Sequence, residues 1–125
     1  MPPDPEFIQH TLADLVRINS INPAFGAGGT DESGAAGLVE HLLSGMGAQV
    51  QRFEFAPGRA SVVGRLPGTG GGRSLMLYGH LDTVGVEGMT RALDPEVRNG
   101  RMYGRGTYDM KGGLTACLAA ARTIA

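Results

Sequence analysis

The stretch LMLYGHLDTV, residues 75–84, decides the fold that this sequence predicts. Residues 74–79, SLMLYG, are apolar on both faces, which is typical of a strand covered on both sides inside an α/β sheet. His80 follows this strand directly, at the carboxyl end, where open α/β sheets place their ligands. The sequence therefore predicts an α/β fold with a polar site at the end of this strand.

Asp82 stands two residues after His80. Residues i and i+2 of an extended segment point the same way, so Asp82 could accept a hydrogen bond from one imidazole nitrogen of His80. That bond would leave the other ring nitrogen unprotonated and would fix the direction in which it points, as a metal-bound histidine requires. Alternatively, His80 caps the strand and Asp82 opens a turn with Thr83. The spacing of two residues alone favours this second interpretation, because a lone His-x-Asp is common.

A second stretch, GRGTYDMKGG at residues 104–113, holds Asp109 between glycine-rich segments. Glycines let the chain turn sharply and approach something small, and a carboxylate can bridge two cations through its two oxygens. With His80, Asp109 supplies one nitrogen and one oxygen ligand suited to zinc. Alternatively, Asp109 caps the helix that follows, with Lys111 solvated in its first turn. The spacing does not decide between these two interpretations.

The rest of the chain predicts three helices and a hairpin. Apolar residues at helical spacing indicate a first helix over residues 5–18, a second that begins after Thr30 and stops at Gly47, and a third over residues 111–125. The composition of NSINPAFGAGGT, residues 19–30, is that of a surface loop. Two extended stretches, residues 49–55 and 60–66, are expected to pair as an antiparallel hairpin, and Asn99-Gly100 is a strong turn signal.

Composition excludes several classes of function. The chain has 125 residues, 42% of them hydrophobic, and a net charge of −1, which suits one globular domain and gives no electrostatic case for nucleic acid or membrane partners. The single cysteine, Cys117, and a start that lacks the features of a signal peptide predict a reduced, cytoplasmic setting. The glycine runs contain no Gly-Lys-Ser or Gly-Lys-Thr, so we reject nucleotide binding.

Together, LMLYGHLDTV and GRMYGRGTYDMKGG resemble the two N-terminal signatures of a zinc-dependent deacylase and exopeptidase family. This family includes acetylornithine deacetylase, succinyl-diaminopimelate desuccinylase, aminoacylase and glutamate carboxypeptidase. The similarity runs more weakly through the first helix, RINSINP and the second helix. The resemblance implies an α/β three-layer sandwich with a mixed sheet, of which residues 1–125 would be the N-terminal portion.

The resemblance also implies a role for each site residue. His80 resembles a metal ligand, Asp82 the catalytic-site carboxylate that orients it, and Asp109 the ligand shared by two metals, followed by a cis peptide bond to Met110. Two zinc ions, for which cobalt or manganese could substitute, would activate a water molecule and polarise the scissile carbonyl of an amide. Tyr108 departs from the family pattern, and so does RALDPEVRNG. Neither departure removes a ligand, but the resemblance does not identify the substrate.

A two-metal site also needs a second histidine, further carboxylates and a glutamate base, which the family supplies after its second signature. Residues 110–125 contain no Asp, Glu or His, and His10 and His41 are predicted to be surface residues of the first two helices. We therefore expect the N-terminal part of a larger, homo-oligomeric hydrolase of small N-acyl amino acids or peptides. The missing remainder would include an inserted dimerisation or lid domain, and this part alone would be inactive. The alternative is a stable, non-catalytic chain with a binding or self-assembly role.

Overall fold

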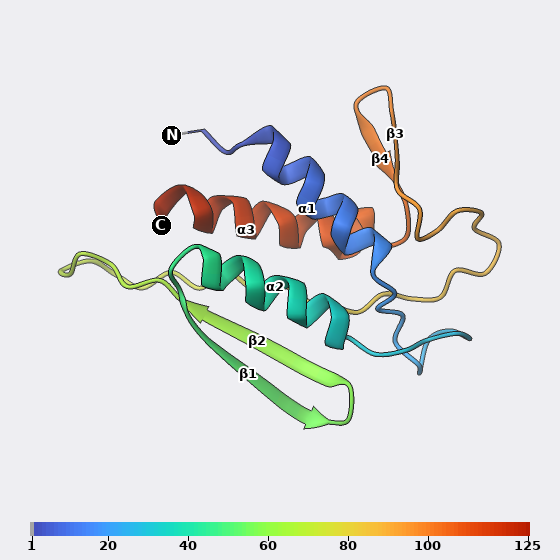
Figure 1. Cartoon of the computed structure of the whole chain (residues 1–125), viewed down its shortest axis with the longest axis horizontal. Coiled ribbons are helices and arrows are strands. Elements are labelled where there is room, and N and C mark those ends of the chain that lie inside the picture. The colour runs from blue at the N-terminus through green and yellow to red at the C-terminus, as the bar shows by residue number, and fades with distance from the viewer. Residues whose placement is uncertain (1) are drawn as a thin grey trace.

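The computed structural model describes residues 2–125, and Figure 1 shows their arrangement. Three helices lie against one another, and the first hairpin lies beside α2, on the side away from α3 (Figure 1). An irregular turn, Thr107–Lys111, leads into the last helix. In chain order the elements are α1 (Pro5–Arg17), α2 (Ser33–Gly45), β1 (Gln49–Ala56), β2 (Arg59–Arg65), β3 (Glu96–Arg98), β4 (Arg101–Tyr103) and α3 (Gly112–Ile124).

The three predicted helices are confirmed, and α1 begins where its capping residues predict. The Asp4 carboxylate accepts hydrogen bonds from the main-chain N–H groups of Glu6 and Phe7, at 3.0 and 3.3 Å, while Pro5 occupies the first helical position. Each helix has 13 residues, and no helix within residues 2–125 is long and apolar enough to cross a membrane.

The predicted start of α2 is wrong. The helix begins at Ser33, and its N-cap residue is Glu32, whose side chain makes no capping bond. The Ser33 N–H donates to the Asp31 carboxylate, at 2.8 Å. The Thr30 hydroxyl donates to the carbonyl oxygen of Asn19, at 3.0 Å, so it is engaged elsewhere and does not cap the helix.

The core lies where the three helices meet. Its buried members come from all three helices. On the side of the first hairpin, the partly buried Val62 of β2 packs against this cluster. This arrangement follows from the helical spacing of apolar residues, because each helix buries one face. The buried cluster consists of Leu15, Ala35, Val39, Leu114 and Leu118.

Both predicted hairpin turns are confirmed. Strands β1 and β2 pair antiparallel from Gln49 opposite Arg65 to Ala56 opposite Arg59, and Gly58 in the turn has a φ of +74°. Strands β3 and β4 also pair antiparallel, and the two residues between them, Asn99 and Gly100, have φ angles of 52° and 72°. Positive φ at both central positions is what Asn-Gly favours in a two-residue hairpin.

The expectation of a strand buried on both faces at residues 74–79 is wrong for this chain. Leu75, Met76 and Tyr78 are 79%, 82% and 78% exposed, and the segment joins neither of the two hairpins that form the sheets of residues 2–125. A strand is buried only where neighbouring strands and covering layers exist, and apolar composition cannot supply them. The α/β class stands, with two small antiparallel hairpins in place of the mixed sheet, and the three-layer sandwich remains a prediction.

The expectation of a surface loop over residues 19–30 is wrong for Ser20, Ile21 and Asn22, which are buried. Ile21 forms an isolated parallel bridge with Thr83. The Thr83 N–H donates to the carbonyl of Ser20, and the Asn22 N–H donates to the carbonyl of Thr83, both at 2.9 Å. This pairing brings the loop after α1 against the stretch that carries His80 and Asp82.

We predict that the chain self-associates, because the exposed apolar residues 75–78 sit on a segment without ladder partners. Static light scattering over the micromolar range should give an apparent mass that rises with concentration. Met76→Lys, which places a charge in the segment, should lower that mass, whereas Gln9→Lys on the exposed side of α1 should not. A monomer at every concentration would show that these residues form no contact between copies.

Candidate metal centre

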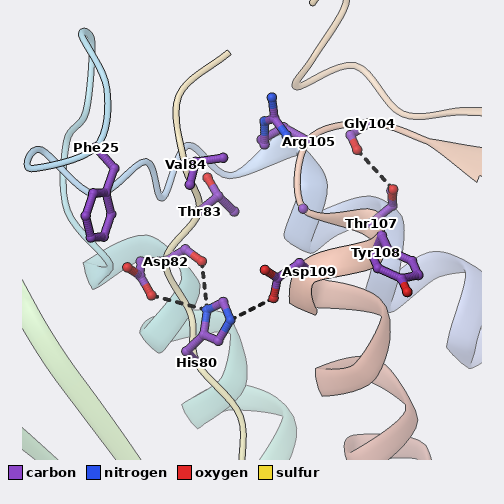
Figure 2. A pocket seen from close by; sticks show the side chains of 11 residues that line it. Phe25, His80, Asp82, Thr83, Val84, Gly104, Arg105, Thr107, Tyr108 and Asp109 are labelled. Carbon is purple, nitrogen blue, oxygen red and sulfur yellow. Dashed lines mark hydrogen bonds and ion pairs between the residues drawn. The ribbon is translucent and has the colours of Figure 1, made fainter. Parts of the chain in front are cut away.

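His80, Asp82 and Asp109 come together at the surface, as Figure 2 shows. The His80 Nε2 atom is 3.0 Å from Asp109 Oδ1. On the other side of the ring, Nδ1 is 3.0 Å from the main-chain oxygen of Asp82 and 3.2 Å from its Oδ1 atom. The imidazole therefore lies between two carboxylates that are 27 residues apart in the sequence.

A close approach at Gly79 sets the position of His80. A Cβ atom on Gly79 would lie only 3.1 Å from the terminal methyl of Met110, so glycine lets the main chain pass directly over that side chain. The His80 N–H donates to the Met110 sulfur at 3.3 Å. His80 is thereby held against the turn that contains Asp109.

The turn Thr107–Lys111 presents Asp109 to His80. Gly106 precedes it with a φ of +81°, and a Cβ there would lie 2.8 Å from the methyl of Thr83. Asp109 leaves the helical conformation, with φ −125° and ψ 104°, and its peptide bond to Met110 is cis, as the family resemblance implies. The Asp109 carboxylate bonds to His80 and makes no cap bond to α3, which argues against the capping interpretation.

Lys111 is buried, which contradicts the alternative interpretation, in which it is solvated in the first turn of the helix. Its Nζ atom donates to the carbonyl oxygens of Leu15, at 2.6 Å, and Ile18, at 3.0 Å, at the end of α1. Carbonyls at a helix C-terminus have no partner within the helix, and a cation satisfies them well. Burial lowers the pKa of the Lys111 ammonium to about 8. The side chain ties the turn that carries Asp109 to α1.

A further residue of the site, Asn22, was not found from the sequence. Its side-chain Nδ2 donates to Asp82 Oδ2 at 2.9 Å, across 60 residues of chain. The sequence feature that could have pointed to Asn22 is its place in RINSINP, a stretch similar to the family. A single asparagine before a proline is, however, ordinary loop composition. Only the pairing of residues 20–22 with Thr83 brings its side chain to Asp82.

The charges around His80 favour a cation. Burial lowers the pKa of the His80 imidazole, but hydrogen bonds to Asp109 and to the Asp82 main chain, with the charges of both carboxylates, raise it more, so its pKa lies above the usual value. Both ring nitrogens face oxygen acceptors, a position that suits an imidazolium. A metal ion between Nε2 and Asp109 would take the place of the Nε2 proton.

The geometry of His80 and Asp109 fits part of a zinc site. Two ligand atoms on one tetrahedral zinc ion lie about 3.4 Å apart, because the metal–ligand bonds are about 2.0–2.2 Å long. Nε2 and Oδ1 are 3.0 Å apart, and their side chains are 42% and 79% exposed, so an ion could enter from solvent. Within residues 2–125, no group of three or more His, Cys, Asp or Glu side chains gathers into a metal site. The described residues thus offer two ligands.

An open pocket of about 620 Å³ lies beside this pair. Its lining includes the aromatic rings of Phe25 and Tyr108 and the side chain of Arg105, all labelled in Figure 2. The two remaining histidines, His10 and His41, are exposed on α1 and α2, as predicted, and neither lines the pocket.

Comparisons with known proteins agree with the resemblance seen in the sequence. The model of the family described as Peptidase family M20/M25/M40 matches residues 76–125, which contain His80, Asp82 and Asp109. The chain is similar to three bacterial proteins named succinyl-diaminopimelate desuccinylase. The protein of Nitrobacter hamburgensis is 41% identical over 86% of this chain and 27% of its own length. Those of Rhodopseudomonas palustris and Cereibacter sphaeroides are 35% and 36% identical over 96% and 97% of this chain, and 30% of their own lengths. The chain thus spans less than a third of the length of these curated relatives.

We predict that Lys111→Ala lowers the free energy of unfolding by about 2–4 kcal/mol, because it removes two hydrogen bonds and leaves a cavity. Lys111→Met should cost less, since it keeps the apolar stem and buries no ammonium. Urea denaturation measures both. The control is Arg17→Ala at the same end of α1, whose exposed ion pair with Asp14 should be worth no more than about 1 kcal/mol. Equal costs for Lys111→Ala and Arg17→Ala would contradict the anchoring role.

Proposed function

We propose that this chain forms part of a metal-dependent hydrolase of amide bonds, because residues 76–125 match the model of peptidase family M20/M25/M40 and the chain is similar to succinyl-diaminopimelate desuccinylases. The observation that carries the proposal is the approach of His80 Nε2 to Asp109 Oδ1, 3.0 Å apart, within the matched residues. A nitrogen and an oxygen ligand facing each other at the surface is the arrangement that zinc accepts.

In the proposed site, His80 Nε2 and the Asp109 carboxylate would hold a zinc ion. Asp82 holds the Nδ1–H group, which keeps the ring in the tautomer that a metal requires. The second oxygen of Asp109 is free to bind a second ion. The bound metal, zinc or a substitute such as cobalt or manganese, supplies an activated water molecule and polarises the amide carbonyl.

Catalysis needs more groups than the described residues bring together. Two ligands leave most of the coordination positions of two ions open, and no glutamate lines the pocket. We propose that residues 1–125 correspond to the N-terminal portion of a catalytic domain with a three-layer α/β sandwich. The remaining ligands, the base and any dimerisation or lid domain would lie outside these residues. The exposed segment 75–78 would be an inner strand of that mixed sheet.

For the substrate we propose a small N-acyl amino acid. The relatives are named for removing a succinyl group from diaminopimelate, which favours deacylation over exopeptidase activity and over a non-catalytic role. The pocket beside His80 and Asp109 suits such a molecule, because Arg105 could pair with a carboxylate while Phe25 contacts the apolar part. The cytoplasmic setting and the homo-oligomeric state expected from the sequence remain predictions.

We expect weak, exchangeable zinc binding at His80. Two protein ligands leave the remaining positions to water, so the affinity should be far below that of a closed four-ligand site. Zinc added to the ¹⁵N-labelled chain should shift the ring resonances of His80, and both His80→Ala and Asp109→Asn should remove the binding. The variants His10→Ala and His41→Ala are matched controls and should bind as the unchanged chain does. Tight, stoichiometric uptake by a monomer, or uptake unaffected by His80→Ala, would contradict the proposed site.

We also expect that the 125-residue chain with added zinc hydrolyses an N-succinyl amino acid no faster than zinc in buffer. The reason is that the described residues bring two ligands together and place no glutamate in the pocket beside them. Release of free amine over hours measures the rate. Zinc-dependent turnover that is lost in His80→Ala would show that these residues suffice for catalysis.

A further inference from the structure

Asn22 holds the carboxylate that holds His80. It lies in the connection between α1 and α2 and is only 7% exposed, although asparagine in a loop is ordinarily solvated. Its side-chain Nδ2 donates to Asp82 Oδ2 at 2.9 Å. Its Oδ1 atom accepts the main-chain N–H of Ala24 at 3.0 Å. Both ends of the amide are therefore engaged.

These partners fix which way the Asn22 amide points. The N–H group of Ala24 can only donate, so the amide oxygen must face it, and the NH₂ group must then face Asp82. The main chain of Asn22 is equally fixed, because its N–H donates to the Thr83 carbonyl and its C=O accepts from Phe25, both at 2.9 Å. The donor aimed at Asp82 thus has little freedom to move.

The effect of this bond falls on the rotation of the Asp82 carboxylate. One oxygen, Oδ2, receives the Asn22 donor, and the other, Oδ1, lies 3.2 Å from His80 Nδ1, which also lies 3.0 Å from the Asp82 main-chain oxygen. Holding one oxygen of a planar carboxylate sets the direction of the other. The Asp82 side chain is 24% exposed, so without Asn22 water could compete for it and let the group turn away from the ring.

We propose that Asn22 is a positioning residue of the candidate metal centre: its amide orients Asp82, Asp82 orients the His80 ring, and the ring thereby presents Nε2 to Asp109. This inference rests on the proposed function in that His80 is taken to bind metal. Asn22 itself touches neither metal nor substrate. It acts through one carboxylate, from a segment 60 residues away from Asp82.

The chain contains a matched control for Asn22. Asn19, in the same connection, also accepts the main-chain N–H two residues ahead, that of Ile21, through Oδ1 at 3.1 Å. Its Nδ2 also donates at 3.1 Å, but to the carbonyl of Gly28, which does not line the pocket. The two asparagines thus share residue type, local turn and two side-chain hydrogen bonds, and differ in whether the donor reaches Asp82.

The test compares Asn22→Asp with Asn19→Asp. Either substitution keeps the oxygen that accepts the main-chain N–H and replaces the donor with an oxygen. We expect Asn22→Asp to weaken zinc binding at His80 about tenfold, because loss of a residue that orients a ligand typically lowers metal affinity by about 10- to 100-fold. Asn19→Asp should change the affinity less than about twofold, in keeping with its distance from that ligand. If Asn22→Asp fails to fold, Asn22→Ser provides the same test. Its hydroxyl can still accept from the Ala24 N–H but cannot reach Asp82, so zinc binding should again weaken about tenfold.

A second readout needs no metal. In the zinc-free chain, the ¹⁵N signal of His80 Nδ1 should move in Asn22→Asp and Asn22→Ser, because one of its two acceptors, the Asp82 carboxylate, is no longer held, and it should stay in Asn19→Asp. If the His80 signal and the zinc affinity of both Asn22 variants match those of Asn19→Asp, the positioning role is overturned. Absence of zinc binding in the unchanged chain would overturn the proposed function instead, and the metal-free spectra would still decide on Asn22.

Discussion

The buried ammonium of Lys111 joins the end of α1 to the turn that carries Asp109, and the rest of the molecule is arranged around that contact. The two carbonyls that it binds, those of Leu15 and Ile18, lie where a helix leaves acceptors without partners. Leu15 also belongs to the core formed with α2 and α3. One side chain thus connects the apolar packing of the helices to the polar turn at the surface.

A second connection, between residues 20–22 and Thr83, meets the first at Gly106. The methyl of Thr83 and the stem of Lys111 both lie within 3.1 Å of where a Cβ of Gly106 would be, so neither could keep its place if this residue had a side chain. Both connections reach the start of one loop, because Lys111 binds the end of α1 and Thr83 binds the residues just after it. The connection between α1 and α2 therefore supports His80 and Asp109 alike.

This support explains how an ordered pair of polar groups can sit at the end of an exposed apolar segment. Residues 75–78 have their side chains in solvent, yet His80 is held from three sides by Met110, Asp82 and Asp109. The proposed metal site depends on those contacts and not on a sheet. On this proposal a metal ion would take the place of the Nε2 proton between His80 and Asp109, and the raised pKa of His80 and the proposed affinity for a cation have the same electrostatic origin.

By itself the sequence determined the three helices, the two hairpin turns and the candidate residues His80, Asp82 and Asp109. Helices and turns follow from apolar spacing, caps and Asn-Gly pairs, which act within a few residues of one another. It did not determine that Lys111 is buried, that Asn22 reaches Asp82, or that SLMLYG is exposed. The first two depend on contacts across 96 and 60 residues, and the third on which strands are present to pair with it. Only the tertiary structure decides these, because a side chain's spacing to its neighbours says nothing about which distant backbone it will meet.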